Sequence, residues 1–247
     1  MRLLLLNGNT DPAITRTLAR RARVVLDGLG HTEVALVPAT ARFGARYVAS
    51  RASAAIAAHA VLEAVAEHFG QFDAVAIACF GDPGLEAVRE IFPGPVTGMA
   101  EASLTLALRL APRIAFLTGG AAWVPMLREF CALRGAGREV VDIRSIPPTG
   151  DLIARDPAAA AVLLSAEAQA AAEAGAGAVV LGGAGLAGMA EMVTAPVPVL
   201  DSLDCLLKEA AARHPRTRPP RPAPTPSQGL AESLGRALAG LEPGKAS

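Results

Sequence analysis

Short apolar runs alternate with longer helical segments along most of the chain. Glycine-rich turns follow many of the runs, and each next segment has apolar residues at helical spacing or is rich in alanine. This pattern predicts strands at 3–6, 32–38, 73–78, 95–98, 113–118, 139–143, 178–181 and 197–200. It predicts helices at 11–29, 50–69, 85–91, 101–110, 124–133, 156–174 and 230–241. Such alternation is typical of parallel sheets covered by helices, so the predicted class is α/β.

The chain also contains an internal repeat. DAVAIACFGDPGL at 73–85 aligns with GAVVLGGAGLAGM at 177–189, and both patterns predict a strand, a glycine-rich turn and then a helix. LNGNT at 6–10 matches LTGGA at 117–121 in the same way. The repeat predicts two similar Rossmann-like (flavodoxin-like) parallel-sheet lobes related by a pseudo-twofold axis.

The repeat divides the chain into two predicted domains. Residues 1–97 together with 205–247 are expected to form the first lobe, and residues 98–204 the second. The segment 215–226 holds six prolines, which predicts a stiff connector before the last helix, with a proline-rich ligand for SH3 or WW domains as the alternative. Ligands bind beyond the carboxyl ends of parallel strands, so an active site is expected at the interface between the lobes.

Composition excludes several classes of function. Lys and Arg together number 23, as do Asp and Glu, so the formal net charge is zero and no basic stripe suits nucleic acid. The three cysteines are widely spaced and only four histidines occur, which argues against a disulfide framework and a metal site. The mean hydropathy of +0.38 comes from many short segments, and the first apolar run is too short for a signal peptide. We therefore expect a cytoplasmic protein with no membrane or nucleic-acid partner.

The most informative single residue is Cys79, which lies between the strand at 73–78 and the turn FGDPG. Free amides at such a turn and at the next helix stabilise a thiolate, so we expect a lowered pKa and a role as nucleophile or proton-transfer base. The alternative is a small buried core residue. In the repeat, Gly183 takes the position of Cys79 and is expected to face it across the cleft.

Other residues are candidates for contact with a substrate. Strand ends and turn amides at this cleft would surround a carbonyl or anionic oxygen, an environment that an enolate needs, although the same residues also suit plain turns. The expected substrate-binding residues are Asn7, Asn9, Thr10, Phe80, Gly81, Thr118, Gly119, Ala184 and Gly185. Asp82 suits a turn or cap better than an acid–base role, and Tyr47 and Trp123 could either line a pocket or pack.

Four motifs resemble the aspartate/glutamate racemase superfamily, most closely its hydantoin and allantoin racemase branch. They are LLLLNGNT at 3–10, ACFGDPGL at 78–85, PVTGMAEAS at 95–103 and VVLGGAGLAGM at 179–189, and the similarity spans most of residues 1–210. The resemblance implies two α/β domains, a site at their interface that needs no cofactor, a small carbonyl substrate and a homo-oligomer. It also implies that Cys79 is catalytic and that Asn9 and the amides near Phe80 and Gly81 hold the substrate.

One position departs from the branch. The resemblance implies that, in the hydantoin and allantoin racemase branch, one cysteine removes the proton alpha to a carbonyl. A second cysteine, on the opposite face of the substrate, gives a proton back. Where the branch reads LGCAGM, this chain reads LGGAGL at 181–186, so Gly183 stands in the place of the second cysteine. A glycine side chain cannot move a proton.

Three hypotheses follow from this departure. The first is a hydantoin racemase-like isomerase in which Cys79 works with water or another side chain. The second is one-base chemistry of the same superfamily, such as an arylmalonate-type decarboxylase, an isomerase or a lyase, which protonates an enolate from one face. The third is a non-catalytic protein that binds a small molecule in the retained cleft.

Overall fold

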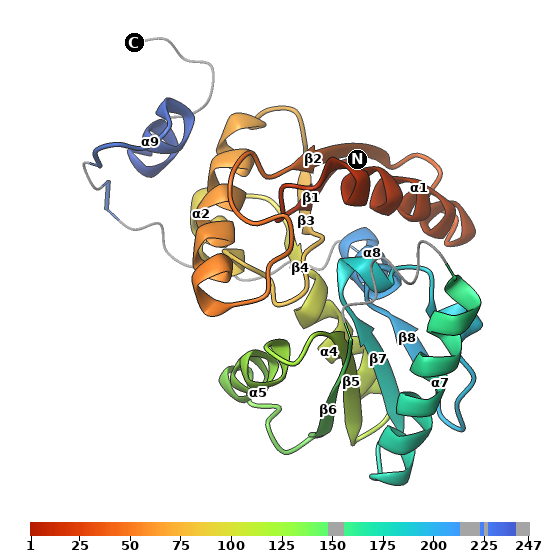
Figure 1. Cartoon of the computed structure of the whole chain (residues 1–247). Coiled ribbons are helices and arrows are strands. Elements are labelled where there is room, and N and C mark those ends of the chain that lie inside the picture. The colour runs from red at the N-terminus through yellow and green to blue at the C-terminus, as the bar shows by residue number, and fades with distance from the viewer. Residues whose placement is uncertain (148–155, 213–222, 225–226, 241–247) are drawn as a thin grey trace.

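Two four-stranded parallel sheets form the centres of two lobes in the computed structural model (Figure 1), which describes residues 1–147, 156–212, 223–224 and 227–240. The first sheet has the order β2-β1-β3-β4, with β1 (Arg2–Asn7), β2 (Ala35–Thr40), β3 (Ala74–Ile77) and β4 (Val96–Gly98). The second has the order β6-β5-β7-β8, with β5 (Ile114–Gly119), β6 (Val140–Ile146), β7 (Ala178–Gly182) and β8 (Val199–Asp201). The predicted α/β class with two similar parallel-sheet lobes is confirmed.

Helices cover both sheets. They are α1 (Pro12–Gly28), α2 (Arg51–Glu67), α3 (Leu85–Ile91), α4 (Met99–Leu110), α5 (Trp123–Leu133), α7 (Pro157–Glu173), α8 (Ser202–Ala211) and α9 (Glu232–Leu238). α1 begins as the sequence predicts: the Asp11 carboxylate accepts a hydrogen bond from the Ala13 N–H at 2.9 Å, and Pro12 stands in the first turn. Among the described residues, no helix is both long and apolar enough to cross a membrane.

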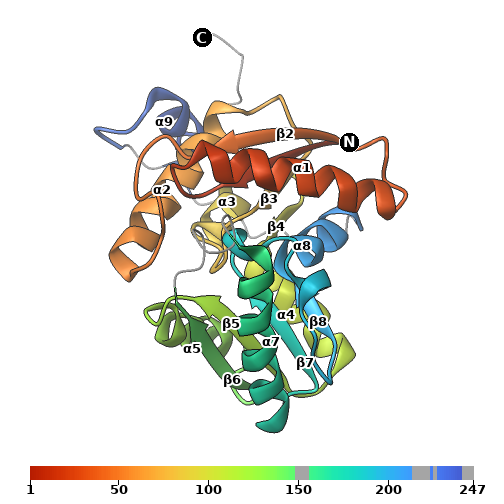
Figure 2. The same ribbon diagram turned by 45° about the vertical axis from the view of Figure 1, so that its right-hand side comes forward.

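The two lobes pack through elements from both halves of the chain. α8 returns from the second half to contact α1, α4 and β3, and Figures 1 and 2 both show it between the two sheets. α9 packs on α2 at the periphery. The exact division into 1–97 plus 205–247 and 98–204 stays a prediction, and most of the proline-rich segment 215–226 lies outside the described residues.

The strand register reproduces the repeat found in the sequence. Leu6 pairs with Ile77 in the first sheet, and Leu117 pairs with Leu181 at the corresponding place in the second. Continued by two residues, the first register brings Gly8 beside Cys79, where a Cβ on Gly8 would lie 3.3 Å from the sulfur. Continued in the same way, the second register brings Gly119 beside Gly183.

One predicted element is absent. The sequence predicts a helix after the GGAGLAG turn, but the chain forms only two short 3₁₀ turns there, η1 (Ala184–Leu186) and η2 (Ala190–Met192). Gly183 has φ +145° and Gly188 has φ +88°, and neither conformation belongs to an α-helix. The wall of the second lobe that faces the cleft is therefore made largely of backbone.

Candidate active site

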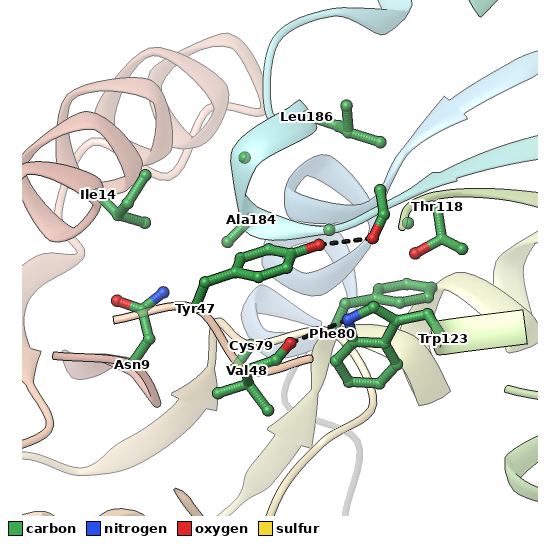
Figure 3. Close-up of a pocket in the computed structure, with 14 residues that line it drawn as sticks. Asn9, Ile14, Tyr47, Val48, Cys79, Phe80, Thr118, Trp123, Ala184 and Leu186 are labelled. Carbon is green, nitrogen blue, oxygen red and sulfur yellow. Dashed lines mark hydrogen bonds between the residues drawn. The ribbon is translucent and has the colours of Figure 1, made fainter. Parts of the chain in front are cut away.

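A cavity of about 140 Å³ lies where the carboxyl ends of the two sheets meet (Figure 3). Its lining residues are Asn9, Ile14, Tyr47, Val48, Cys79, Phe80, Thr118, Gly119, Trp123, Gly182, Gly183, Ala184, Gly185 and Leu186. The set includes Cys79 and Gly183, and it draws on loops and strand ends of both lobes. The cavity lies here because the turns that follow the strands of one sheet face the turns that follow the strands of the other sheet.

Cys79 is held tightly at the floor of the cavity. Its side chain is 5 % exposed, and its sulfur accepts a hydrogen bond from the Gly8 N–H. Burial raises the pKa of the Cys79 thiol to about 12, the nearby Asp82 carboxylate adds to the rise, and the Gly8 N–H lowers it. The expected lowering of the pKa is therefore wrong. The Gly8 N–H favours the thiolate, but its effect is smaller than that of burial.

Gly183 forms part of the opposite wall. A Cβ built on Gly183 would meet no atom of the described residues within 4 Å. Its N–H lies 3.4 Å from the Ser202 hydroxyl. Ala184 and Gly185 begin η1, and the first amides of a helical turn have no acceptor within it. This wall can donate hydrogen bonds to an oxygen atom, and the residues Gly183, Ala184 and Gly185 carry no acidic or basic side chain.

Polar side chains contribute further donors from both lobes. The Asn9 Oδ1 accepts hydrogen bonds from the Asn7 amide and the Asp11 N–H, both at 2.9 Å, so its Nδ2 is the end that turns toward the cavity in Figure 3. Thr118 lines the side contributed by β5. These groups suit the carbonyl oxygens of a small substrate.

Two aromatic residues connect the lobes across the cavity. The Tyr47 hydroxyl, from the loop between β2 and α2, donates to the Gly119 carbonyl at 2.5 Å. The Trp123 Nε1, from the start of α5, donates to the Val48 carbonyl at 2.9 Å. Both bonds are drawn in Figure 3. The sequence left open whether these two aromatic residues line a pocket or pack against other residues. In the structure they do both.

Comparisons with known proteins agree with this arrangement. The family model for Asp/Glu/hydantoin racemase matches residues 3–210. A hydantoin racemase of Rhizobium meliloti is 36% identical over 143 residues, which are 57% of this chain and 59% of that protein. Another, of a Pseudomonas species (strain NS671), is 32% identical over 208 residues, 82% of each chain. The chain belongs to the Asp/Glu/hydantoin racemase family.

A solved structure of this family extends the likeness to the fold. The crystal structure of an allantoin racemase from Pseudomonas fluorescens is 30% identical, with 86% of this chain and 90% of that chain covered, and its TM-score is 0.80. The membership suggested by the motifs is confirmed, and the relatives support a racemase-family function for this chain.

Three residues expected in the site lie outside the cavity lining. Asn7 is 1 % exposed, and its side-chain amide donates to the Asn9 Oδ1, the Asp11 carbonyl and the Thr15 hydroxyl. These bonds stabilise the NGNT turn. The Thr10 N–H is bound to the Ala45 carbonyl. Gly81 lies under Trp123, whose ring would be 2.5 Å from an added Cβ. A substrate contact by these residues stays a prediction.

Asp82 serves as a cap, the structural role favoured from the sequence. Its carboxylate accepts hydrogen bonds from the Ala100 and Glu101 N–H groups, both at 2.8 Å, at the start of α4. Burial raises the pKa of Asp82 to about 7, and the two amide donors oppose the rise. This carboxylate links the turn after Cys79 to the helix that leads into the second lobe.

Ile14, Val48 and Leu186 join the lining without any sequence signal for that role. Each is an ordinary apolar residue in its own segment, and only the packing of the lobes brings it to the cavity. None of the described residues that line the cavity has a charged side chain. In the described part of the chain, no cluster of three or more His, Cys, Asp or Glu side chains could hold a metal ion.

Proposed function

We propose that this protein racemises a neutral, hydantoin-like cyclic amide by proton transfer at the carbon alpha to a carbonyl, with Cys79 as one proton-transfer group and without a cofactor. The names of its relatives, hydantoin racemase and allantoin racemase, support this substrate class. As expected from the resemblance, we also propose that the protein is a cytoplasmic homo-oligomer. Size-exclusion chromatography of the purified chain tests the oligomeric state.

The observation that carries the proposal is the uncharged lining of the cavity. Donors such as the Asn9 Nδ2 and the amides of Ala184 and Gly185 can bind carbonyl oxygens, whereas no Arg or Lys in the described part of the chain lines the cavity to pair with a carboxylate. An ionised carboxylate in such a site would lose water and have only neutral donors as partners, which is less favourable than binding the carbonyl oxygens of a neutral ring. The site therefore favours a neutral ring over an amino-acid or malonate substrate.

The chemistry begins with a thiolate. Cys79 takes the alpha proton: an S–H bond forms, the C–H bond breaks, and the electron pair moves into the adjoining carbonyl, which becomes an enolate oxygen. Amides on the second lobe, those of Ala184 and Gly185, stabilise the developing charge. Protonation of the carbon from the opposite face then gives the other enantiomer.

Isotope exchange tests the proposal. Each enantiomer of a 5-substituted hydantoin is incubated with the protein in deuterium oxide, and optical rotation and deuterium at C5 are followed together. The wild type is expected to incorporate deuterium and lose optical rotation, while Cys79→Ser, which keeps the size of the side chain but not its acidity, loses at least about 100-fold in rate. Absence of exchange with every hydantoin offered contradicts the proposal.

A second candidate rests on Gly183. Because no side chain of the described residues lies within 4 Å of a Cβ built there, an enolate could be protonated by Cys79 from one face only, as in decarboxylation or isomerisation. Exchange of deuterium with full retention of optical rotation, or release of carbon dioxide from a disubstituted malonate, favours this candidate. Binding of a hydantoin that is unaffected by Cys79→Ala, with no turnover, identifies a non-catalytic binding protein.

A further inference from the structure

We propose that Tyr47 is the second proton-transfer group, and that its hydroxyl works from the wall of the second lobe where Gly183 provides no side chain. The proposal rests on the racemase function proposed above and names the group that takes the second face of the substrate. Tyr47 belongs to the first lobe by sequence but reaches across the cavity to the second.

The position of the hydroxyl follows from the sheet register. Thr118 pairs with Gly182, so Gly119 and Gly183 are neighbours at the ends of β5 and β7. The Tyr47 hydroxyl lies 2.5 Å from the Gly119 carbonyl oxygen, and it would lie 3.3 Å from a Cβ built on Gly119. The hydroxyl is therefore seated on the strand next to Gly183.

The two lobes then show a matched arrangement. In the first, the Cys79 sulfur lies beside Gly8; in the second, the Tyr47 oxygen lies beside Gly119, which the repeat aligns with Gly8. Cys79 and Tyr47 line the same cavity, as Figure 3 shows. A flat ring bound between the lobes would meet the sulfur on one face and the phenol on the other.

The loop that carries Tyr47 is fixed on both sides of it. Toward the first lobe, the Ala45 carbonyl accepts from the Thr10 N–H at 3.1 Å, and Arg46 pairs with Asp11 at 3.0 Å. Toward the second, the next residue, Val48, accepts from Trp123. Tyr47 itself is 52 % exposed, so burial of its ring in the core does not account for its position. Fixed placement of an acid or base is what catalysis requires.

The phenol is suited to the acid half of the reaction. Burial raises the pKa of Tyr47 above its ordinary value, a hydrogen bond with Trp123 opposes the rise, and the nearby Cys79 adds to it, so the hydroxyl holds its proton at neutral pH. In one direction the Cys79 thiolate takes the alpha proton and the Tyr47 O–H gives its proton to the carbanion, leaving a thiol and a phenolate. Proton exchange with water then returns both groups to their starting state. The reverse direction uses the phenolate as base and the thiol as acid.

Tyr47→Phe, which removes only the hydroxyl, tests the proposal against Trp123→Phe, which removes the bond from Trp123 to the Val48 carbonyl but leaves the Tyr47 hydroxyl in place. Both enantiomers of a 5-substituted hydantoin are incubated in deuterium oxide with each variant, and thermal unfolding verifies folding. Tyr47→Phe is expected to lower inversion at least about 100-fold. It should still exchange the enantiomer whose C–H faces Cys79, with retention, and leave the other enantiomer without exchange. Cys79→Ala should show the opposite preference, and Trp123→Phe should slow both enantiomers by the same factor.

The outcomes separate the two proposals. If the wild type inverts the substrate and Tyr47→Phe inverts it equally well, or slows both enantiomers alike as Trp123→Phe does, the role of Tyr47 is refuted and the racemase function stands. If the wild type itself exchanges deuterium only with retention, the racemase function fails, and the role of Tyr47 fails with it. Loss of exchange for one enantiomer only is a result that a merely structural role of Tyr47 does not produce.

Discussion

Gly183→Cys places a thiol on the wall of the second lobe, and Gly183→Ala is its matched control. The described residues leave space for it, because none of their atoms lies within 4 Å of a Cβ built at this position. The obstacle is the backbone: Gly183 has φ +145°, which residues with a side chain rarely adopt. Such strain costs on the order of 1–3 kcal/mol. For a chain of this size, each kcal/mol lowers the unfolding midpoint by about 2–4 °C, so both variants should melt about 2–12 °C below the wild type.

Gly183→Cys and Gly183→Ala should have similar stability but different racemase activity. In the Tyr47→Phe background, Gly183→Cys is expected to restore inversion by at least about tenfold, because a thiol is itself an acid–base group on the face that has lost its hydroxyl. Gly183→Ala carries the same backbone strain and should restore nothing. Polarimetry with each enantiomer, together with thermal unfolding of all variants, measures both quantities on the same preparations.

Two results would refute this reasoning. A folded Tyr47→Phe/Gly183→Cys protein that reacts with a thiol reagent but does not invert the substrate shows that position 183 does not face the reacting carbon. The face-to-face arrangement of Cys79 and Gly183 would then be wrong. Unfolding midpoints of Gly183→Ala and Gly183→Cys equal to that of the wild type would show that the φ of Gly183 relaxes without strain.

Three further predictions concern pH and packing. Because the pKa of Cys79 is raised to about 12, kcat/KM for the enantiomer that needs its thiolate should rise about tenfold per pH unit between about pH 6 and 9; a plateau below pH 8 in the pH–rate profile contradicts this. Burial raises the pKa of Asp82 to about 7, so its stabilising contribution is complete below its unfolded pKa near 3.8 and is lost as the pH rises to about 7. Urea unfolding between about pH 4 and 7 should show the free energy of unfolding of the wild type falling by up to about 4 kcal/mol relative to Asp82→Asn. If the free energies of the two proteins change in parallel with pH, the raised pKa of Asp82 is excluded. Gly182→Ala brings a Cβ to 2.4 Å from the Phe80 ring and should lower the free energy of unfolding by about 1–3 kcal/mol; an unchanged urea midpoint would mean that the lobes separate freely at this contact.

Much of the fold was predictable because parallel strands buried on both faces leave a strong trace in sequence. The LLLL run of β1 is at most 1 % exposed, and β3 and β7 are buried along their whole length. Edge strands were placed less well: β2 begins at Ala35 rather than at 32, and β6 continues to Ile146 rather than ending at 143. Half-buried edges have a weaker apolar pattern, which makes their ends ambiguous.

The chemical state of the site was less predictable than its position. The turn after Cys79 indicates free amides, which by themselves lower the pKa of a thiol. Whether water reaches the sulfur depends on Phe80, Trp123 and the lobe opposite, and these are tertiary contacts that no local pattern records. For the same reason Tyr47 had no distinct signal: its partner Gly119 lies in another lobe, 72 residues along the chain.

The missing helix after β7 gives the asymmetry of the site a physical cause. In the first lobe, Cys79 is followed by a turn and α3, whereas in the second, Gly183 is followed only by short 3₁₀ turns. The second lobe thus contributes donors from its backbone, while Cys79 and Tyr47 both belong to the first lobe. A change in the position of one lobe relative to the other would shift the amides proposed to bind an enolate oxygen, and it would break the bond between Tyr47 and Gly119 as well. The bond from Tyr47 to Gly119 therefore exists only while the two lobes keep the arrangement seen here.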